Sequence, residues 1–150
     1  MTAQPYVSKG CFGCGTENPR SLGIKPQLKD GWMVAEVTIP EDYRGFSKLV
    51  HGGITALLCD ELMGMAVGAH LDGLAATVEL NVQFRKPAFI DTPLTVKARY
   101  LEAEAKFHFA EARIETAEGK AITTANGKFY ELSDKDTKKM FLGRSGRVRG

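Results

Sequence analysis

The sequence predicts a protein of the α+β class. Three observations lead to this class: an alternating segment from Trp32 to Ile39, a long apolar segment from about His51 to Gly68, and several strand-like segments after it. Alternation of apolar and polar residues indicates a strand, whereas a long apolar segment of this kind indicates a helix. The chain of 150 residues lies within the size range of one domain. The order of these segments permits an antiparallel sheet around one long helix.

The first strand and the helix follow from their residue patterns. Pro40 ends the alternating segment, as expected at the end of a strand. The helix is apolar on nearly all sides, so we expect it to be buried on most sides, with the sheet wrapped around it. In the strand, alternate residues share a face: Met33, Ala35, Val37 and Ile39 on one side, and Trp32, Val34, Glu36 and Thr38 on the other.

The rest of the chain contains strand patterns separated by turn-forming residues. Strands are expected at Ala75–Arg85, Pro93–Glu102, Lys106–Thr116 and Lys120–Leu132. The breaks between them fall at Pro87, Asp91-Thr92-Pro93, Glu102-Ala103-Glu104 and Glu118-Gly119. The sequence contains neither an internal repeat nor a low-complexity segment.

The start of the predicted helix, His51-Gly52-Gly53, has the features of a site for a developing negative charge. The first backbone N–H groups of a helix have no partners within the helix and carry the positive end of its dipole. Glycine lets a substrate oxygen approach these groups closely. We therefore interpret the tripeptide as an oxyanion site. The structural alternative is a simple turn that leads into the helix.

Asp60 is the acid that we expect to act at this helix. At about 100° per residue, it falls on the same side as Gly53 and Gly64, in a groove without bulky neighbours. A carboxylate in such an apolar segment needs a partner or a function, because burying an unpaired charge is costly. Gly64 indicates that a second helix or a ligand approaches the backbone. The large apolar residues fall on the opposite side: Ile54, Leu57, Leu58, Leu62 and Met65.

Three segments together resemble a known family. They are His51-Gly52-Gly53-Ile54, Asp60-Glu61-Leu62-Met63-Gly64, and the run TVELNVQFRKP from Thr77 to Pro87. From about Cys11 to Leu132, the chain resembles the hotdog-fold acyl-CoA thioesterases of the PaaI and THEM type. The resemblance implies an antiparallel sheet wrapped around one long helix. It also implies a homodimer, or a dimer of dimers, with active sites at the subunit interface.

The resemblance further implies roles for single residues. The Gly52 N–H would bind the thioester carbonyl, and His51 would shape the same pocket. Asp60 of the facing subunit would act as general base or as nucleophile. Thr77 matches the position of a hydroxyl group that places the attacking water. Residues expected to bind the substrate are Gly53, Glu61, Gly64, Asn81, Arg85 and Lys86.

Some of these residues have structural alternatives. Glu61 falls near the apolar stripe of the helix, so we expect its carboxylate to accept hydrogen bonds from loop backbone near Tyr43 or Gly45. Arg85 and Lys86 suit the phosphates of coenzyme A at the mouth of the pocket. Their alternative is a solvated strand end.

The predicted activity is hydrolysis of an acyl-CoA thioester to the free acid and coenzyme A, without a cofactor. A non-catalytic acyl-CoA binding module is one alternative, and Asp60 argues against it because it provides a group for turnover. A hotdog dehydratase or hydratase is the other alternative. Such an enzyme normally needs a catalytic histidine and acid in an arrangement that His51-Gly52-Gly53 does not resemble.

The cysteine spacing does not predict a metal site. Cys11 and Cys14 form a CxxC pair, and Cys59 stands alone in the helical segment, where we interpret it as a small buried residue. Structural zinc sites typically take four nitrogen or sulfur ligands, and the three histidines are not spaced as a second ligand pair. We therefore expect no metal and interpret residues 8–24 as a tight, glycine-rich cap.

The sequence predicts one domain over residues 1–133 and a basic tail over residues 134–150. Six Lys and Arg against two acids indicate a solvated end, with attraction to phosphate as the alternative. The tail lacks interleaved aromatic residues, so nucleic-acid binding is not expected. The first six residues lack leader features, and the apolar stretches look too short or too interrupted to span a bilayer. We therefore expect a cytoplasmic protein without membrane contact.

Overall fold

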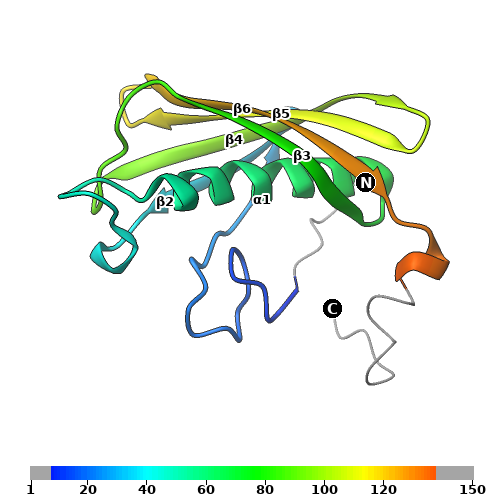
Figure 1. Ribbon diagram of the computed structural model, residues 1–150, viewed down its shortest axis with the longest axis horizontal. Helices are drawn as coiled ribbons and strands as arrows, with labels where there is room; N and C mark the ends of the chain where they lie inside the picture. The colour runs from blue at the N-terminus through cyan, green and yellow to red at the C-terminus, as the bar shows by residue number, and fades with distance from the viewer. Residues whose placement is uncertain (1–7, 138–150) are drawn as a thin grey trace.

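The computed structural model describes residues 8–137 and contains a six-stranded antiparallel sheet packed on one long helix (Figure 1). The sheet order is β1-β2-β4-β5-β6-β3. This arrangement confirms the predicted α+β class and the hotdog fold. The elements are β1 Gln27–Lys29, β2 Trp32–Thr38, the 3-10 helix η1 Glu41–Tyr43, α1 Gly52–Leu71, β3 Ala75–Phe84, β4 Pro93–Glu104, β5 Phe107–Thr116 and β6 Ala121–Glu131.

The predicted strands after the helix agree with β3 to β6 to within two residues at each end. The sequence did not predict β1, because its three residues are all exposed and show no alternation. The helix α1 ends at Leu71, later than predicted. Asp72 ends it by adopting a left-handed conformation with φ of 51°, and its N–H donates to the Gly68 carbonyl. The basic tail falls largely outside the described residues.

The hydrophobic core lies between α1 and the face of the sheet that curves over it (Figure 1). Leu58 and Leu62 of α1 are fully buried there, together with Met33 of β2, Ile114 of β5 and Phe129 of β6. Removing side chains of this size from water is the main favourable contribution to folding. The core therefore fixes α1 against the sheet over most of its length, and with it the residues of the predicted site.

The expectation that α1 is buried on most sides is met only in part. Eight of its twenty residues are buried in the single chain, including Cys59, which confirms the interpretation of that residue. Within the described residues, α1 is also the one helix that is long and apolar enough to span a membrane by length and composition, contrary to the sequence expectation. The core helix of a folded domain passes the same test, and the buried residues of α1 pack against the sheet.

The N-terminal segment lies on the side of α1 that faces away from the sheet (Figure 1). Its turns are held by backbone hydrogen bonds, among them Gly15 N–H to the Cys11 carbonyl at 2.8 Å. A Cβ atom at Gly15 would collide with the carbonyl oxygens of Lys9 and Cys11, so this turn requires glycine. Cys14 is buried and joins the core. The segment thus covers part of the helix that the sheet leaves open.

Strand β3 forms one edge of the sheet. Its register against β6 shifts between Thr77 and Glu79, which indicates a bulge at that point. Val78, Leu80 and Phe84 are large apolar residues that β3 exposes. A long edge strand with exposed apolar side chains is a surface on which another strand can pair.

Candidate active site

The start of α1 has one free backbone donor. His51 is the N-cap residue, and its Nδ1 accepts a hydrogen bond from the Gly53 N–H at 2.9 Å. The cap therefore already uses the Gly53 N–H group in the single chain, and the role of Gly53 in binding substrate stays a prediction. Within the described residues, the Gly52 N–H has no hydrogen-bond partner. It is the group at this helix start that a substrate oxygen can reach.

A cavity of about 220 Å³ opens at this helix start. Gly52 and Thr55 of α1 line one part of it, and Phe84, Arg85 and Lys86 at the end of β3 line another. A Cβ atom added at Gly52 would lie 3.7 Å from Phe84 Cε1, an ordinary van der Waals contact. The fold therefore tolerates a side chain at Gly52, but that side chain would occupy the space beside the free N–H.

Thr123 of β6 lines the same cavity, and sequence reasoning missed it. The residue is only 1% exposed, and its Oγ1 has no hydrogen-bond partner among the described residues. A buried hydroxyl without a partner is costly, so most native structures satisfy it with protein, water or ligand. In the sequence Thr123 looks like any strand threonine. Its significance becomes visible only when the strand is placed over the helix.

Asp60 and Thr77 meet at a second cavity, of about 200 Å³. The Thr77 hydroxyl on β3 donates a hydrogen bond of 2.8 Å to Asp60 Oδ1 on α1. Burial raises the pKa of the Asp60 carboxyl above its usual value. The Thr77 hydrogen bond opposes this rise, and the neighbouring Glu61 charge adds to it. The structure thus joins two of the predicted catalytic residues through one carboxylate oxygen.

The surroundings of Asp60 differ from the predicted open groove. Met65 and Leu74 line the cavity, so the expectation of no bulky neighbours is wrong. Leu74 lies in the loop that follows α1, so a helical wheel of α1 does not include it. A Cβ atom at Gly64 would lie 3.7 Å from Phe129 Cε1, which is ordinary contact. Close packing does not require glycine at position 64, and the missing side chain leaves the cavity open beside Asp60.

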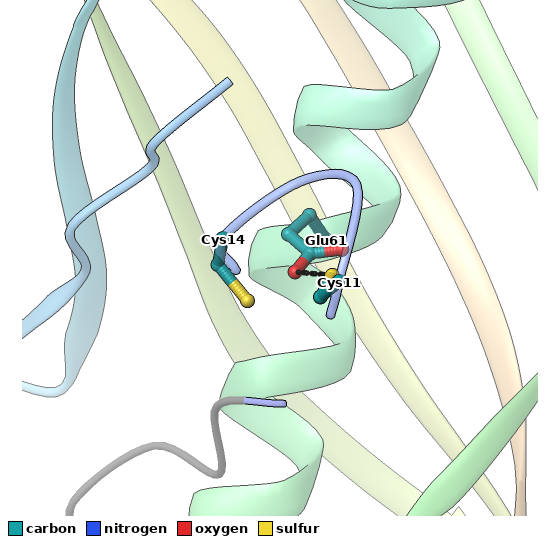
Figure 2. A group of neighbouring side chains, drawn as sticks. All are labelled: Cys11, Cys14 and Glu61. Carbon is teal, nitrogen blue, oxygen red and sulfur yellow. Dashed lines mark hydrogen bonds between the residues drawn. The ribbon is translucent and has the colours of Figure 1, made fainter. Parts of the chain in front are cut away.

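Glu61 does not contact the loop that the sequence predicted. Its Oε1 accepts a hydrogen bond from the Cys11 thiol, with Sγ at 3.2 Å (Figure 2). The Tyr43 hydroxyl donates to the Arg20 carbonyl, and the Gly45 N–H donates to the Leu49 carbonyl. The prediction is wrong because the N-terminal segment packs on this side of α1, a tertiary contact that no local pattern of residues indicates. Glu61 also lines the cavity beside Asp60.

The remaining predicted substrate contacts divide into two groups. Arg85 and Lys86 lie at the helix-start cavity, and Arg85 Nε donates to Thr124 Oγ1 at 3.0 Å. Asn81 is exposed on β3, accepts a hydrogen bond from Gln83 at 3.1 Å and lines neither cavity. The single chain therefore does not bring Asn81 to the site.

His70 and His108 both contact Tyr100. The His70 ring stacks on Tyr100 with centroids 3.6 Å apart. The Tyr100 hydroxyl lies 3.3 Å from His108 Nδ1, and His108 Nε2 lies 3.3 Å from Glu131 Oε2. These residues are far apart in the sequence, and the packing of α1 on the sheet together with the pairing of β4, β5 and β6 brings them together. They line neither of the two cavities.

The free donor and the acid are far apart within one chain. Gly52 and Asp60 are separated by eight residues of continuous helix. At a rise of 1.5 Å per residue, this is about 12 Å along the axis. A thioester carbonyl bound to the Gly52 N–H is therefore out of reach of Asp60 of the same chain.

The sequence profile of the thioesterase superfamily matches residues 48–123, which include α1, β3 and the start of β6. The chain belongs to the thioesterase superfamily. Thioester hydrolysis is the activity to which this membership points. Both cavities are lined by residues of the matched segment, including Gly52, Asp60, Thr77 and Thr123. None of the curated proteins compared with the chain matches it.

Solved structures of thioesterases share the fold of this superfamily member. One thioesterase superfamily protein has a TM-score of 0.76 and 26% identity, over 82% of this chain and 61% of the other. A hypothetical thioesterase from Streptococcus pneumoniae, solved with coenzyme A, has a TM-score of 0.67 and 20% identity over 73% and 89% of the two chains. The phenylacetic acid degradation protein PaaI of Thermus thermophilus has a TM-score of 0.66 and 20% identity over 74% and 95%. The chain spans less than two thirds of the length of the first of these proteins.

Proposed function

We propose that this protein hydrolyses an acyl-CoA thioester and that two chains form each active site. The observation that carries the proposal is the Asp60–Thr77 pair, a carboxylate held at 2.8 Å by a hydroxyl group in a cavity. This pair occurs on the same helix as a free N–H at Gly52. An acid and an oxyanion donor are the two groups that thioester hydrolysis requires.

The Gly52 N–H acts on the charge that develops during attack. The thioester carbonyl lies against the helix start and gains negative charge as a nucleophile adds to its carbon. A backbone donor at a helix N-terminus stabilises that charge, and the helix dipole adds to the effect. The thiolate of coenzyme A is a good leaving group. The site therefore does not need a strong acid on the sulfur side.

Asp60 supplies the group that starts the attack. Its Oδ1 is held by Thr77, which leaves Oδ2 available to the cavity. That oxygen either takes a proton from water or attacks the carbonyl carbon directly. Burial raises the pKa of Asp60, which makes its carboxylate a stronger base than an exposed aspartate.

Gly52 and Asp60 lie about 12 Å apart within one chain, so each site takes its Gly52 from one copy of the chain and its Asp60 from a second copy. Strand β3 offers a free edge with exposed Val78, Leu80 and Phe84. Pairing of two such edges about a twofold axis runs the two helices in opposite directions. The Asp60 carboxylate of one chain then approaches the Gly52 N–H of the other. Each dimer has two equivalent sites of this kind.

Arg85 and Lys86 support coenzyme A as the carrier of the acyl group. Both side chains line the cavity that contains Gly52 and are exposed, so they offer positive charge where phosphates can reach it. The related Streptococcus pneumoniae thioesterase was solved with coenzyme A, which supports this class of substrate. A cytoplasmic location stays a prediction.

Incubation with a panel of acyl-CoA thioesters tests the proposal. Chromatographic detection of free coenzyme A is preferable to a thiol reagent, because the chain has three free cysteines of its own. We expect release of coenzyme A from at least one member of the panel, with saturation, and its loss in Asp60→Asn. Tight binding of acyl-CoA without release in the parent protein would instead support a binding module and contradict the proposal.

A further inference from the structure

Two cysteines and one glutamate converge between the N-terminal segment and α1. The Cys11 and Cys14 sulfur atoms and a Glu61 carboxylate oxygen all lie within 4.8 Å of one another. Figure 2 shows the three side chains grouped between the N-terminal loop and the helix. Cys14 is buried, and Cys11 and Glu61 are half-buried, so the group is partly shielded from water. None of the catalytic steps above uses either cysteine.

We propose that Cys11, Cys14 and Glu61 bind one Zn²⁺ ion. Thiolate and carboxylate groups are both zinc ligands, with Zn–S distances of about 2.3 Å and Zn–O distances of about 2.0 to 2.2 Å. The sequence prediction of no metal considered only nitrogen and sulfur ligands. The fold supplies an oxygen ligand from α1, which lies fifty residues from Cys11 in the sequence.

The loop geometry fits this ligand set. The Gly13 N–H donates a hydrogen bond to Cys11 Sγ at 3.3 Å, and a donor of this kind stabilises a thiolate ligand. A Cβ atom at Gly13 would lie 2.6 Å from Glu61 Cδ. Glycine between the two cysteines is therefore what allows the loop to approach the carboxylate. Glycine is needed at position 13 for this close contact and not for its backbone conformation, because Gly13 does not adopt a left-handed conformation.

Little rearrangement is needed to bind the ion. Tetrahedral zinc places two sulfur ligands about 3.8 Å apart. The three ligand atoms already lie within 4.8 Å of one another, so they must close by about 1 Å at most. Both thiols release a proton to the solvent on binding. Two thiolates, one carboxylate and Zn²⁺ together carry a net charge of −1, and a water molecule fills the fourth position.

The ion links the N-terminal segment to α1, because its ligands come from both. Glu61 directly follows Asp60, so the segment would be anchored beside the candidate catalytic acid without contributing to the chemistry. Metal binding to a folded protein contributes to its stability, since the unfolded chain lacks the assembled site. This proposal does not rest on thioester hydrolysis, because metal binding is measured without substrate.

Zinc titration of the full chain tests the site. The reduced protein, stripped with a chelator, is titrated with Zn²⁺ in competition with a chromophoric chelator, and in parallel with Co²⁺ as a spectroscopic probe. We expect one ion per chain, together with thiolate-to-cobalt charge-transfer absorption. Cys14→Ser should lower that absorption by about half in the cobalt-loaded protein and weaken zinc binding by about 100-fold or more. Glu61→Gln should weaken zinc binding by about tenfold or more, since it removes the oxygen ligand.

Matched variants separate a site from adventitious binding to thiols. Cys59→Ala removes the third cysteine, and Asp60→Asn removes the neighbouring carboxylate. Both should retain the parental zinc affinity. Gly13→Ala keeps all three ligands but displaces Glu61, and should weaken zinc binding by about tenfold. Glu61→Gln and Gly13→Ala retain both cysteines, so they test the site even where a cysteine variant does not fold.

Three results would overturn the proposal. The first is less than one zinc per chain after reduction and titration. The second is unchanged zinc affinity in Glu61→Gln, which would show that the carboxylate is not a ligand. The third is loss of affinity in Cys59→Ala as large as that in Cys14→Ser, which would show that binding depends on thiols in general.

Discussion

Asp60 and Glu61 are adjacent carboxylates on one helix, yet they belong to different regions of the molecule. Asp60 faces β3 and accepts a hydrogen bond from the Thr77 hydroxyl. Glu61 faces the N-terminal segment and accepts one from the Cys11 thiol. A turn of about 100° per residue separates the two side chains by enough to meet different elements. The chemistry of each carboxylate is therefore set by the element packed on its side of α1.

Substituting each acid by its amide separates the two regions most strongly. Asp60→Asn should lower kcat by about 10³-fold, because it removes the base or nucleophile. In the metal-free protein, Glu61→Gln should leave kcat within about threefold and lower the free energy of unfolding by about 1 kcal/mol through its weakened contact with Cys11. Steady-state kinetics and urea denaturation of the two proteins provide both measurements. An equal loss of kcat in the two variants, at equal stability, would contradict the division.

Gly52→Val extends the comparison to the start of the helix. The valine side chain should exclude the thioester carbonyl from the free N–H and lower kcat by about 10²- to 10³-fold. Folding should survive, because the added Cβ makes only ordinary contact with Phe84. Substrate affinity should change less than kcat, since the donor acts mainly on charge formed during attack. A folded variant with kcat within threefold of the parent would return His51-Gly52-Gly53 to a structural role.

Thr77→Val sharpens the account of the Asp60 side. Loss of the hydrogen bond to the carboxylate should lower kcat by about tenfold, since such a bond contributes about 1.5 kcal/mol or more. Thr77→Ser keeps the hydroxyl group and should retain most of the activity. The ratio of kcat between the valine and serine variants measures the contribution of the hydroxyl. Equal kcat in the valine and serine variants would show that the Thr77 hydroxyl has no part in catalysis.

Thr123→Val gives the smallest expected effect. It should raise KM, which weakens activity, and should increase stability. Its Oγ1 is buried without a partner among the described residues, so its removal should increase the free energy of unfolding slightly. If a bound substrate or its water forms a hydrogen bond with this hydroxyl, the substitution should raise KM by about threefold. This change corresponds to less than 1 kcal/mol of binding free energy. Unchanged KM with increased stability would show that the hydroxyl has no part in binding.

The fold was largely predictable because its signals are local. Alternation placed the strands, and Pro87 and Gly119 lie in the connections that separate them. The exception is β1, whose residues Gln27–Lys29 are exposed on all positions and give no such signal. Strand pairing with β2 forms it, and that is a contact the local sequence does not encode.

The candidate site was predictable only where its residues lie on one element or matched the family motif. Gly52 and Asp60 share α1, and the motif supplied Thr77. The Cys11–Glu61 contact joins segments fifty residues apart, and nothing in the local pattern of either residue indicates it. The unpaired hydroxyl of Thr123 likewise depends on where β6 crosses the helix start. Such contacts depend on tertiary packing, which periodicity and composition do not specify.

A mixed-dimer assay tests most directly that two chains share each site. Asp60→Asn and Gly52→Val chains are each nearly inactive as homodimers. After subunit exchange, a heterodimer contains one site with both an intact Gly52 and an intact Asp60. Random exchange should therefore restore about a quarter of the parental activity, since half of the dimers have one of two sites intact. If subunit exchange is verified and the mixture is no more active than the mean of the two inactive homodimers, the shared site is contradicted.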